Sequence, residues 1–249
     1  MNRLAAPFRS LARAPLGALS ALFPAPIPVP GPFLAALLLL WPASPAPAHP
    51  HVFVDAGIEI TLDPDGRLEA ITVTWIYDEY YSLLITEELG LDPDYDGVLT
   101  AEETATLTGF DMNWAPGFNG DLEATLDGAP LALSGPEAAT AALRPDGRIL
   151  TTHRRAVPAR PAMAGRVLSL KPYDESYYTA YEVPQPPVLT GDAGSDCQLQ
   201  RLYPDIDGQL EQMRQMLLSI DADADLEEND IPLIGAQFAT EIRLTCPAR

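Results

Sequence analysis

Hydrophobic and polar positions alternate along several short segments of the chain, which is the pattern of half-buried β-strands. The first two segments, His51 to Leu62 and Leu68 to Tyr77, are separated by Asp63-Pro64-Asp65-Gly66, and turn residues between two such runs predict a β-hairpin. Further strands are predicted at Leu122–Leu126, Pro130–Leu133, Ile149–Val157, Arg166–Lys171, Tyr177–Val183 and Phe238–Cys246. The pattern predicts a β-rich α+β fold with an antiparallel, β-sandwich-like core.

Segments of helical composition interrupt this series of strands. Glu79 to Leu89 and Ala101 to Leu107 are predicted helices on either side of an acidic loop, and Gly208 to Ile220 is a later one. The first two therefore predict a helix–loop–helix insertion at about residues 79–114.

The acidic loop has the spacing of a twelve-residue calcium loop, with carboxylates at positions 1, 3, 5 and 12 and glycine at position 6. Its predicted ligands are Asp92, Asp94, Asp96, the carbonyl of Val98, Thr100 through a water, and Glu103. An acidic chain also contains solvated Asp/Gly loops, which is the alternative interpretation. Because a single loop cannot form the paired unit of a calcium sensor, we expect an EF-hand-like structural calcium site with a dissociation constant on the order of 10⁻⁴–10⁻³ M.

The charge of the chain changes which partners are expected. It has 249 residues, 15 Lys and Arg against 35 Asp and Glu, and a formal net charge of −20. Such a chain has no basic surface to neutralise phosphates, so nucleic-acid binding is not expected and cations are the natural partners. An apolar fraction of 47% is typical of a folded domain rather than a disordered acidic tail.

Residues 1–48 differ from the rest, because they contain arginines but no Asp, Glu, Lys or His. The apolar run from Phe33 to Trp41 is too short to span a bilayer, and the small residues Ala46-Pro47-Ala48 follow it. We expect a signal peptide over 1–48, cleavage after Ala48, and a periplasmic domain over 49–249 without a later transmembrane segment. An uncleaved anchor, or a shorter signal from a later start codon, is the alternative.

Cleavage after Ala48 would place His49-Pro50-His51 at the N-terminus. The terminal amine and the ring of His49 could then chelate Ni, Co, Zn or Cu. Pro50 has no N–H, so a square-planar site that uses both intervening amides is blocked. A brace-like site completed by His51 or His153 remains possible, with Asp55 as a distant ligand or supporting partner on the same strand face as His51. Two solvated imidazoles on a frayed terminus are the alternative.

His153 is the third histidine, in a strand-like run that continues with Arg154 and Arg155. These basic neighbours disfavour a cation. We expect an exposed strand histidine and keep His153 as an alternative transition-metal ligand.

Cys197 and Cys246 are the two cysteines. Export would oxidise them to a disulfide, and closing such a long loop contributes roughly 4 kcal/mol in the chain-entropy model. Neither lies in a Cys-x-x-Cys motif, so a redox role is not expected.

Several segments together resemble the bacterial family of unknown function numbered 1007. They are the His49–Asp55 start, Thr74–Glu79, the Asp92–Glu103 loop, Tyr173–Tyr178 and the late cysteines. Members are commonly labelled periplasmic components of an uncharacterised ABC-type transport system, and they are similar to proteins encoded beside nickel/cobalt-type permeases. The resemblance implies a transport accessory that handles a transition metal, with a membrane permease or ABC-type transporter as its partner.

The leading hypothesis is a non-enzymatic periplasmic protein that binds a transition metal at its processed start and calcium in its loop. A histidine-brace copper enzyme with monooxygenase-like oxidative chemistry is one alternative. A structural permease partner that binds no transition metal is the other.

Overall fold

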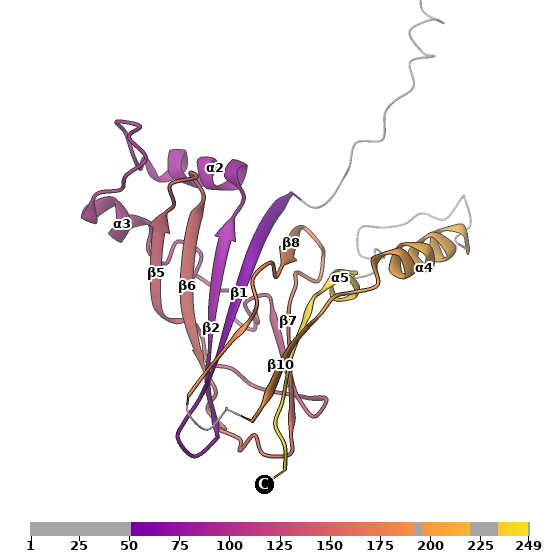
Figure 1. Cartoon of the computed structure of the whole chain (residues 1–249). Helices are drawn as coiled ribbons and strands as arrows, with labels where there is room; N and C mark the ends of the chain where they lie inside the picture. The colour runs from indigo at the N-terminus through magenta and orange to yellow at the C-terminus, as the bar shows by residue number, and fades with distance from the viewer. Residues whose placement is uncertain (1–50, 192–195, 220–233, 249) are drawn as a thin grey trace, which may run out of the picture. The chain divides into compact units, whose positions relative to one another are not determined.

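Two packed β-sheets form the folded part of the chain (Figure 1). The computed structural model describes residues 51–191, 196–219 and 234–248. The predicted signal peptide, His49 and Pro50 lie outside the described residues. The confirmed fold is β-rich and sandwich-like, and its sheets are mostly antiparallel.

The larger sheet has the strand order β5-β6-β2-β1-β8, and β9 also pairs with β1. Its strands are β1 (Val52–Leu62), β2 (Leu68–Tyr77), β5 (Glu137–Leu143), β6 (Ile149–Ala156), β8 (Thr179–Glu182) and β9 (Val188–Thr190). Neighbours are antiparallel except that β8 and β9 run parallel to β1.

The smaller sheet is antiparallel throughout, in the order β10-β11-β7-β3-β4. Its strands are β3 (Leu122–Leu126), β4 (Ala129–Pro130), β7 (Val167–Pro172), β10 (Gln198–Leu202) and β11 (Glu241–Thr245). The two inner faces share one hydrophobic core, in which Ile60 and Ile71 of the larger sheet and Leu168, Leu170 and Ile242 of the smaller sheet are completely buried.

The predicted hairpin of β1 and β2 is confirmed, with Val54 opposite Tyr77 and Ile60 opposite Ile71. Its turn is held by the Asp63 carboxylate, which accepts hydrogen bonds from the backbone amides of Asp65 and Arg67. Burial alternates along β1, so its even-numbered residues face the core and its odd-numbered residues face outward.

The predicted helices of the insertion are also confirmed, as α2 (Glu79–Leu89) and α3 (Ala101–Leu107), both between β2 and β3 in the chain. Asp78 caps the N-terminus of α2 by accepting the Tyr81 amide, and Gly90 ends the helix in a left-handed conformation. The later helices are α4 (Ile206–Ser219) and α5 (Gly235–Phe238). None of the described helices is long and apolar enough to cross a membrane.

Strands β5, β9 and β10 were not predicted. β5 is rich in alanine, which has low strand propensity, and it forms only because its backbone pairs with β6 at the edge of the sheet. Pairing of this kind depends on a distant segment, so local pattern does not reveal it.

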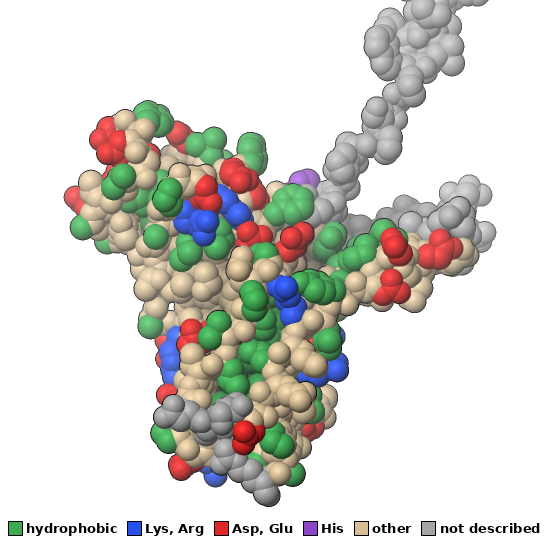
Figure 2. All heavy atoms as spheres, viewed as in Figure 1, with side chains coloured by type: hydrophobic (Ala, Val, Ile, Leu, Met, Phe, Trp, Pro, Cys, Tyr) green, Lys and Arg blue, Asp and Glu red, His purple; other side chains and the backbone are tan. Residues whose placement is uncertain are grey.

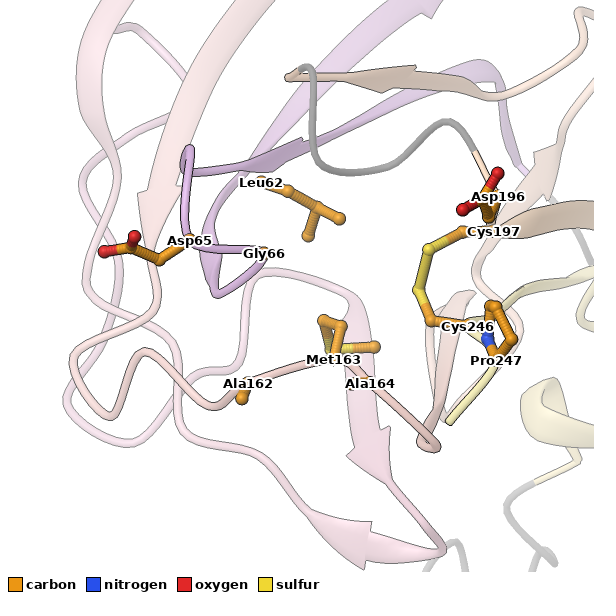
Figure 3. A pocket seen from close by; sticks show the side chains of 10 residues that line it. All are labelled: Leu62, Asp65, Gly66, Ala162, Met163, Ala164, Asp196, Cys197, Cys246 and Pro247. Carbon is orange, nitrogen blue, oxygen red and sulfur yellow. A yellow bond between two sulfur atoms is a disulfide. The ribbon is translucent and has the colours of Figure 1, made fainter. Parts of the chain in front are cut away.

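The expected disulfide between Cys197 and Cys246 is present, with an S–S distance of 2.03 Å. It joins the residue before β10 to the residue after β11. A small cavity of about 50 Å³ lies beside it, lined by Leu62, Met163 and the disulfide itself (Figure 3). The cavity lies at the end of β1 opposite to His51, so it takes no part in the candidate site.

Candidate functional site

His51 lies immediately before β1, where backbone contacts fix the position of the chain. Its amide donates to the Tyr178 carbonyl at 2.9 Å, and its ring lies 4.9 Å from the Tyr178 ring. The side chain of His51 is exposed. The third residue after the predicted cleavage site is therefore anchored to the sandwich rather than frayed.

Asp55 lies on the same outward face of β1 as His51 and Phe53, as strand alternation predicted. Its carboxylate pairs with Arg148, at 2.8 Å between Oδ2 and Nη1. Four residues of extended chain span about 13 Å, so Asp55 and His51 cannot ligate the same ion. Asp55 does not support His51 either, because its carboxylate accepts a hydrogen bond from Arg148 in a groove on the outer face of the sheet.

His153 is only 1% exposed, so the prediction of an exposed strand histidine is wrong. It lies on the inward face of β6 together with Thr151 and Arg155. Segment 108–121, which connects α3 to β3, supplies the Trp114 ring that lies 5.5 Å from the imidazole. Sequence alternation alone could not choose which face of β6 this segment covers.

The structure does not bring His153 close to His51. His153 pairs with Val73 of β2, which in turn pairs with Ile58 of β1. Ile58 is seven residues beyond His51, or about 23 Å along the strand, and the two histidines lie on opposite faces of the sheet. A brace that combines His51 with His153 is incompatible with this register.

Around His153 lies a buried polar cluster of residues from three strands and the 108–121 segment. Asp111 Oδ2 accepts hydrogen bonds of 2.8 Å from the Tyr77 hydroxyl and from Thr151 Oγ1. The His153 ring meets Trp75 and Trp114 edge-on, with centroids 5.0 and 5.5 Å away. Among the described residues, the buried side-chain atoms without a hydrogen-bond partner are both ring nitrogens of His153 and Asp111 Oδ1.

Burial dominates the ionisation of this cluster. Desolvation, followed by the positive charge of Arg155, lowers the pKa of His153 to about 4, so its ring is neutral at pH 7. Desolvation also raises the pKa of Asp111 and raises that of Tyr77 well above its ordinary value. A neutral imidazole between two indoles can direct its N–H at an aromatic face, which is a weak hydrogen bond.

Asp121 extends the cluster toward β8, where its Oδ2 accepts a 2.8 Å hydrogen bond from the Tyr181 hydroxyl. Burial raises the pKa of Asp121 to about 6, despite that hydrogen bond. Arg155 completes the cluster: its Nη1 donates to the Asn119 carbonyl, its Nε donates to the Ser134 carbonyl, and its guanidinium lies over the Trp114 ring.

Sequence reasoning missed Asp111, Trp114 and Asp121, because isolated residues in a Gly-rich connection carry no periodic signal. Gly120 offered an indirect signal. A Cβ there would come within 2.2 Å of the Trp114 ring, and its φ of +71° also favours glycine. The cluster around His153 does not bring three His, Cys, Asp or Glu ligand atoms close together. Among the described residues, the one group that does so is Asp92, Asp94 and Asp96.

Those three aspartates lie in the predicted calcium loop, with ligand oxygens within 4.8 Å of one another. Asp92 organises the loop by accepting the amides of Asp96 and Gly97, each at 3.0 Å. Tyr95 and Gly97 have positive φ, which allows the chain to turn sharply around the carboxylates.

The remaining predicted ligands have other contacts in the loop. Thr100 is the N-cap of α3 and forms the predicted capping box with Glu103. The Glu103 carboxylate accepts the amides of Thr100 at 2.7 Å and Asp92 at 2.9 Å. Hydrogen bonding with the Thr100 side chain, followed by these two amides, lowers the pKa of Glu103. Val98 is exposed. The structure therefore brings three of the predicted ligand residues together, while Glu103 joins the first residue of the loop to the start of α3.

Comparison with the curated proteins gives no match. A family model does match, over residues 34–246, and its description is protein of unknown function, DUF1007. The match covers the whole β-sandwich and the insertion, and the chain belongs to this family.

Proposed function

We propose that this chain is an exported, non-enzymatic accessory protein that binds a transition metal at a processed His49-Pro50-His51 start. The observation that carries the proposal is the placement of His51, which is exposed yet anchored through Tyr178 at the start of β1. Anchoring reduces the entropy lost when the His51 ring joins the amine and ring of His49 as the third nitrogen ligand. The partner that receives or supplies the metal would be a membrane permease or ABC-type transporter.

The binding arrangement uses the amine and ring of His49 with the ring of His51, because no other described histidine is within reach. Nitrogen ligands of this kind suit Ni, Co, Zn and Cu. The register that separates His51 from His153 disfavours a copper site that uses both of these rings. A copper enzyme built on His49 and His51 would use the same donor set, so it stays the alternative to the binding and delivery role.

Calcium is the second proposed ligand, as a structural ion of the Asp92–Glu103 loop. The donor chemistry fits, because clustered carboxylate oxygens are what Ca²⁺ prefers. Asp92, Asp94 and Asp96 would hold the ion. Loss of mutual repulsion between these carboxylates would stabilise the loop and the two helices that it joins.

The first experiment determines the N-terminus of the exported protein by intact mass spectrometry. A first residue of His49 is expected, and any other mature terminus would remove the chelate and overturn the proposal.

The second experiment titrates the mature apo-protein with Cu, Ni, Co and Zn by calorimetry. The matched control carries one additional alanine before His49, which keeps both imidazoles but moves the amine away. Its affinity should fall at least tenfold, and the His51→Ala variant should also bind more weakly. Equal affinity in all three proteins would contradict the proposed site.

A further inference from the structure

Helix α2 carries hydrophobic side chains on its outward face. Tyr80, Leu83 and Leu84 are 78%, 56% and 50% exposed. Their spacing of i, i+3 and i+4 places them together on one side of the helix, which we call the α2 stripe. The opposite side is already used, because Ser82 and Ile85 are buried against the sandwich. The stripe is thus additional to what the fold needs.

The α2 helix and the residues that follow it carry acidic side chains. Segment 78–103, which contains α2, the acidic loop and the start of α3, has nine Asp and Glu residues and no Lys, Arg or His. Glu79, Glu87 and Glu88 lie on α2 itself and are exposed. Hydrophobic and acidic side chains are interspersed over this end of the molecule (Figure 2).

The two arginines in the connection between β5 and β6 are both paired with acidic residues. Arg148 donates to the Tyr77 carbonyl and forms an ion pair with Asp55, and Arg144 forms an ion pair with Asp146. They therefore leave the negative potential around the stripe largely intact.

The α2 stripe is also fixed next to the start of β1. Asp78, the N-cap of α2, accepts the Phe53 amide at 2.8 Å, and the Asp78 amide donates to the Phe53 carbonyl at 2.9 Å. Phe53 is two residues from His51. A molecule bound along α2 would consequently lie close to the proposed metal-binding terminus.

We propose that the α2 stripe is a docking surface for an amphipathic helix of a partner protein, with apolar side chains flanked by Lys and Arg. Apolar anchors would cover Tyr80, Leu83 and Leu84, and the basic residues would meet the surrounding carboxylates. A second copy of this chain would bring two acidic surfaces together, and an anionic bilayer would be repelled, so both fit less well.

This inference deepens the proposed function and rests on it for the role of the docked partner. The experiments nevertheless distinguish a failure of the docking proposal from a failure of the metal-binding proposal. A variant of the α2 stripe should keep the metal affinity of the mature protein, and a variant of His51 should keep the docking affinity.

The test uses a fluorescein-labelled, 18-residue Leu/Lys peptide designed as an amphipathic helix, and measures its anisotropy with the mature protein. The Leu83→Ser/Leu84→Ser double variant should bind at least tenfold more weakly. Its matched control is Val188→Ser/Leu210→Ser, which removes two side chains that are also 50% exposed but lie elsewhere, and leaves the charge unchanged. The control should bind like the wild type, and circular dichroism checks that both variants fold.

Charge is tested with the Glu87→Gln/Glu88→Gln variant and with a Leu/Glu peptide. The variant should bind the Leu/Lys peptide more weakly, and the Leu/Glu peptide should not bind. Equal binding by both serine double variants, or no binding to the wild type, would overturn the proposal. Dimerisation abolished by Leu83→Ser/Leu84→Ser would instead identify a second copy as the occupant. Stripe-dependent binding to phosphatidylcholine vesicles would identify a bilayer, and either result would also overturn it.

Discussion

Phe53 and Asp78 hold the start of β1 and the start of α2 together through two hydrogen bonds. The Phe53 amide donates to the Asp78 carboxylate, and the Asp78 amide donates to the Phe53 carbonyl. The other carboxylate oxygen of Asp78 caps α2 by accepting the Tyr81 amide. One side chain thus positions the helix that carries the proposed docking surface relative to the strand that carries His51.

Replacing Asp78 should destabilise this junction. Asp78→Ala removes the helix cap and the acceptor for the Phe53 amide, and should lower the free energy of unfolding by about 1–2 kcal/mol. Asp78→Asn retains one acceptor oxygen and should lose less. Urea denaturation measures both, and an alanine variant as stable as the wild type would contradict the role of Asp78.

The calcium proposal predicts a stabilising effect of calcium that depends on Asp94. Asp94 makes no hydrogen bond among the described residues, and Asp94→Asn removes one of three mutually repelling charges. The variant should therefore leave the apo-protein at least as stable as the wild type. Calcium in the millimolar range should raise the melting temperature of the wild type and raise that of the variant much less. A wild type that does not respond to calcium would rule out the site.

Burial of His153 predicts a loss of stability in acid. The unfolded chain takes up a proton at the ordinary pKa of 6.5, whereas the folded ring stays neutral down to about 4. The stabilising contribution is therefore complete above pH 6.5 and decreases as the pH falls toward 4, by about 3 kcal/mol in total. The His153→Phe variant cannot titrate there and should lose that much less stability between pH 7 and pH 4, measured by urea denaturation. Parallel pH profiles would show that His153 titrates normally.

Asp121 predicts the opposite dependence. Its pKa is about 6 in the folded protein against an ordinary 3.8, so the folded state binds the extra proton between these values. Its contribution to stability is complete below pH 3.8 and decreases as the pH rises through 6, by about 2 kcal/mol after allowance for partial exposure. Asp121→Asn keeps an acceptor for Tyr181 and should gain stability over the wild type at pH 7 but not at pH 4. An equal difference at both pH values would refute the shifted pKa.

The disulfide predicts strong dependence on oxidation. Cys197 and Cys246 are separated by 49 positions, and opening a loop of this length costs about 4 kcal/mol in the chain-entropy model. The Cys197→Ser/Cys246→Ser variant should unfold at lower urea concentration than the oxidised wild type, with reduced wild type as the control. Reduction that leaves the urea midpoint unchanged would contradict this contribution.

The sequence alone determined the features that depend on neighbouring residues. Alternation and turn residues predicted the β1–β2 hairpin, and composition with a capping box predicted α2 and α3. The spacing of Asp92, Asp94 and Asp96 predicted a local carboxylate cluster, because a twelve-residue loop brings its own side chains together. Alternation also correctly placed His51, Phe53 and Asp55 on one face of β1.

What covers each face of the sheets depends on packing between segments that are distant in the chain. His153 was predicted to be exposed, but segment 108–121 packs over it and supplies Trp114, and the pairing of β6 with β2 keeps it far from His51. Asp111 and Asp121 belong to this segment, and their pKa values are raised because its packing buries them. Pairing, register and burial join residues distant in the chain, and a local pattern has no information about which distant segment will provide the partner.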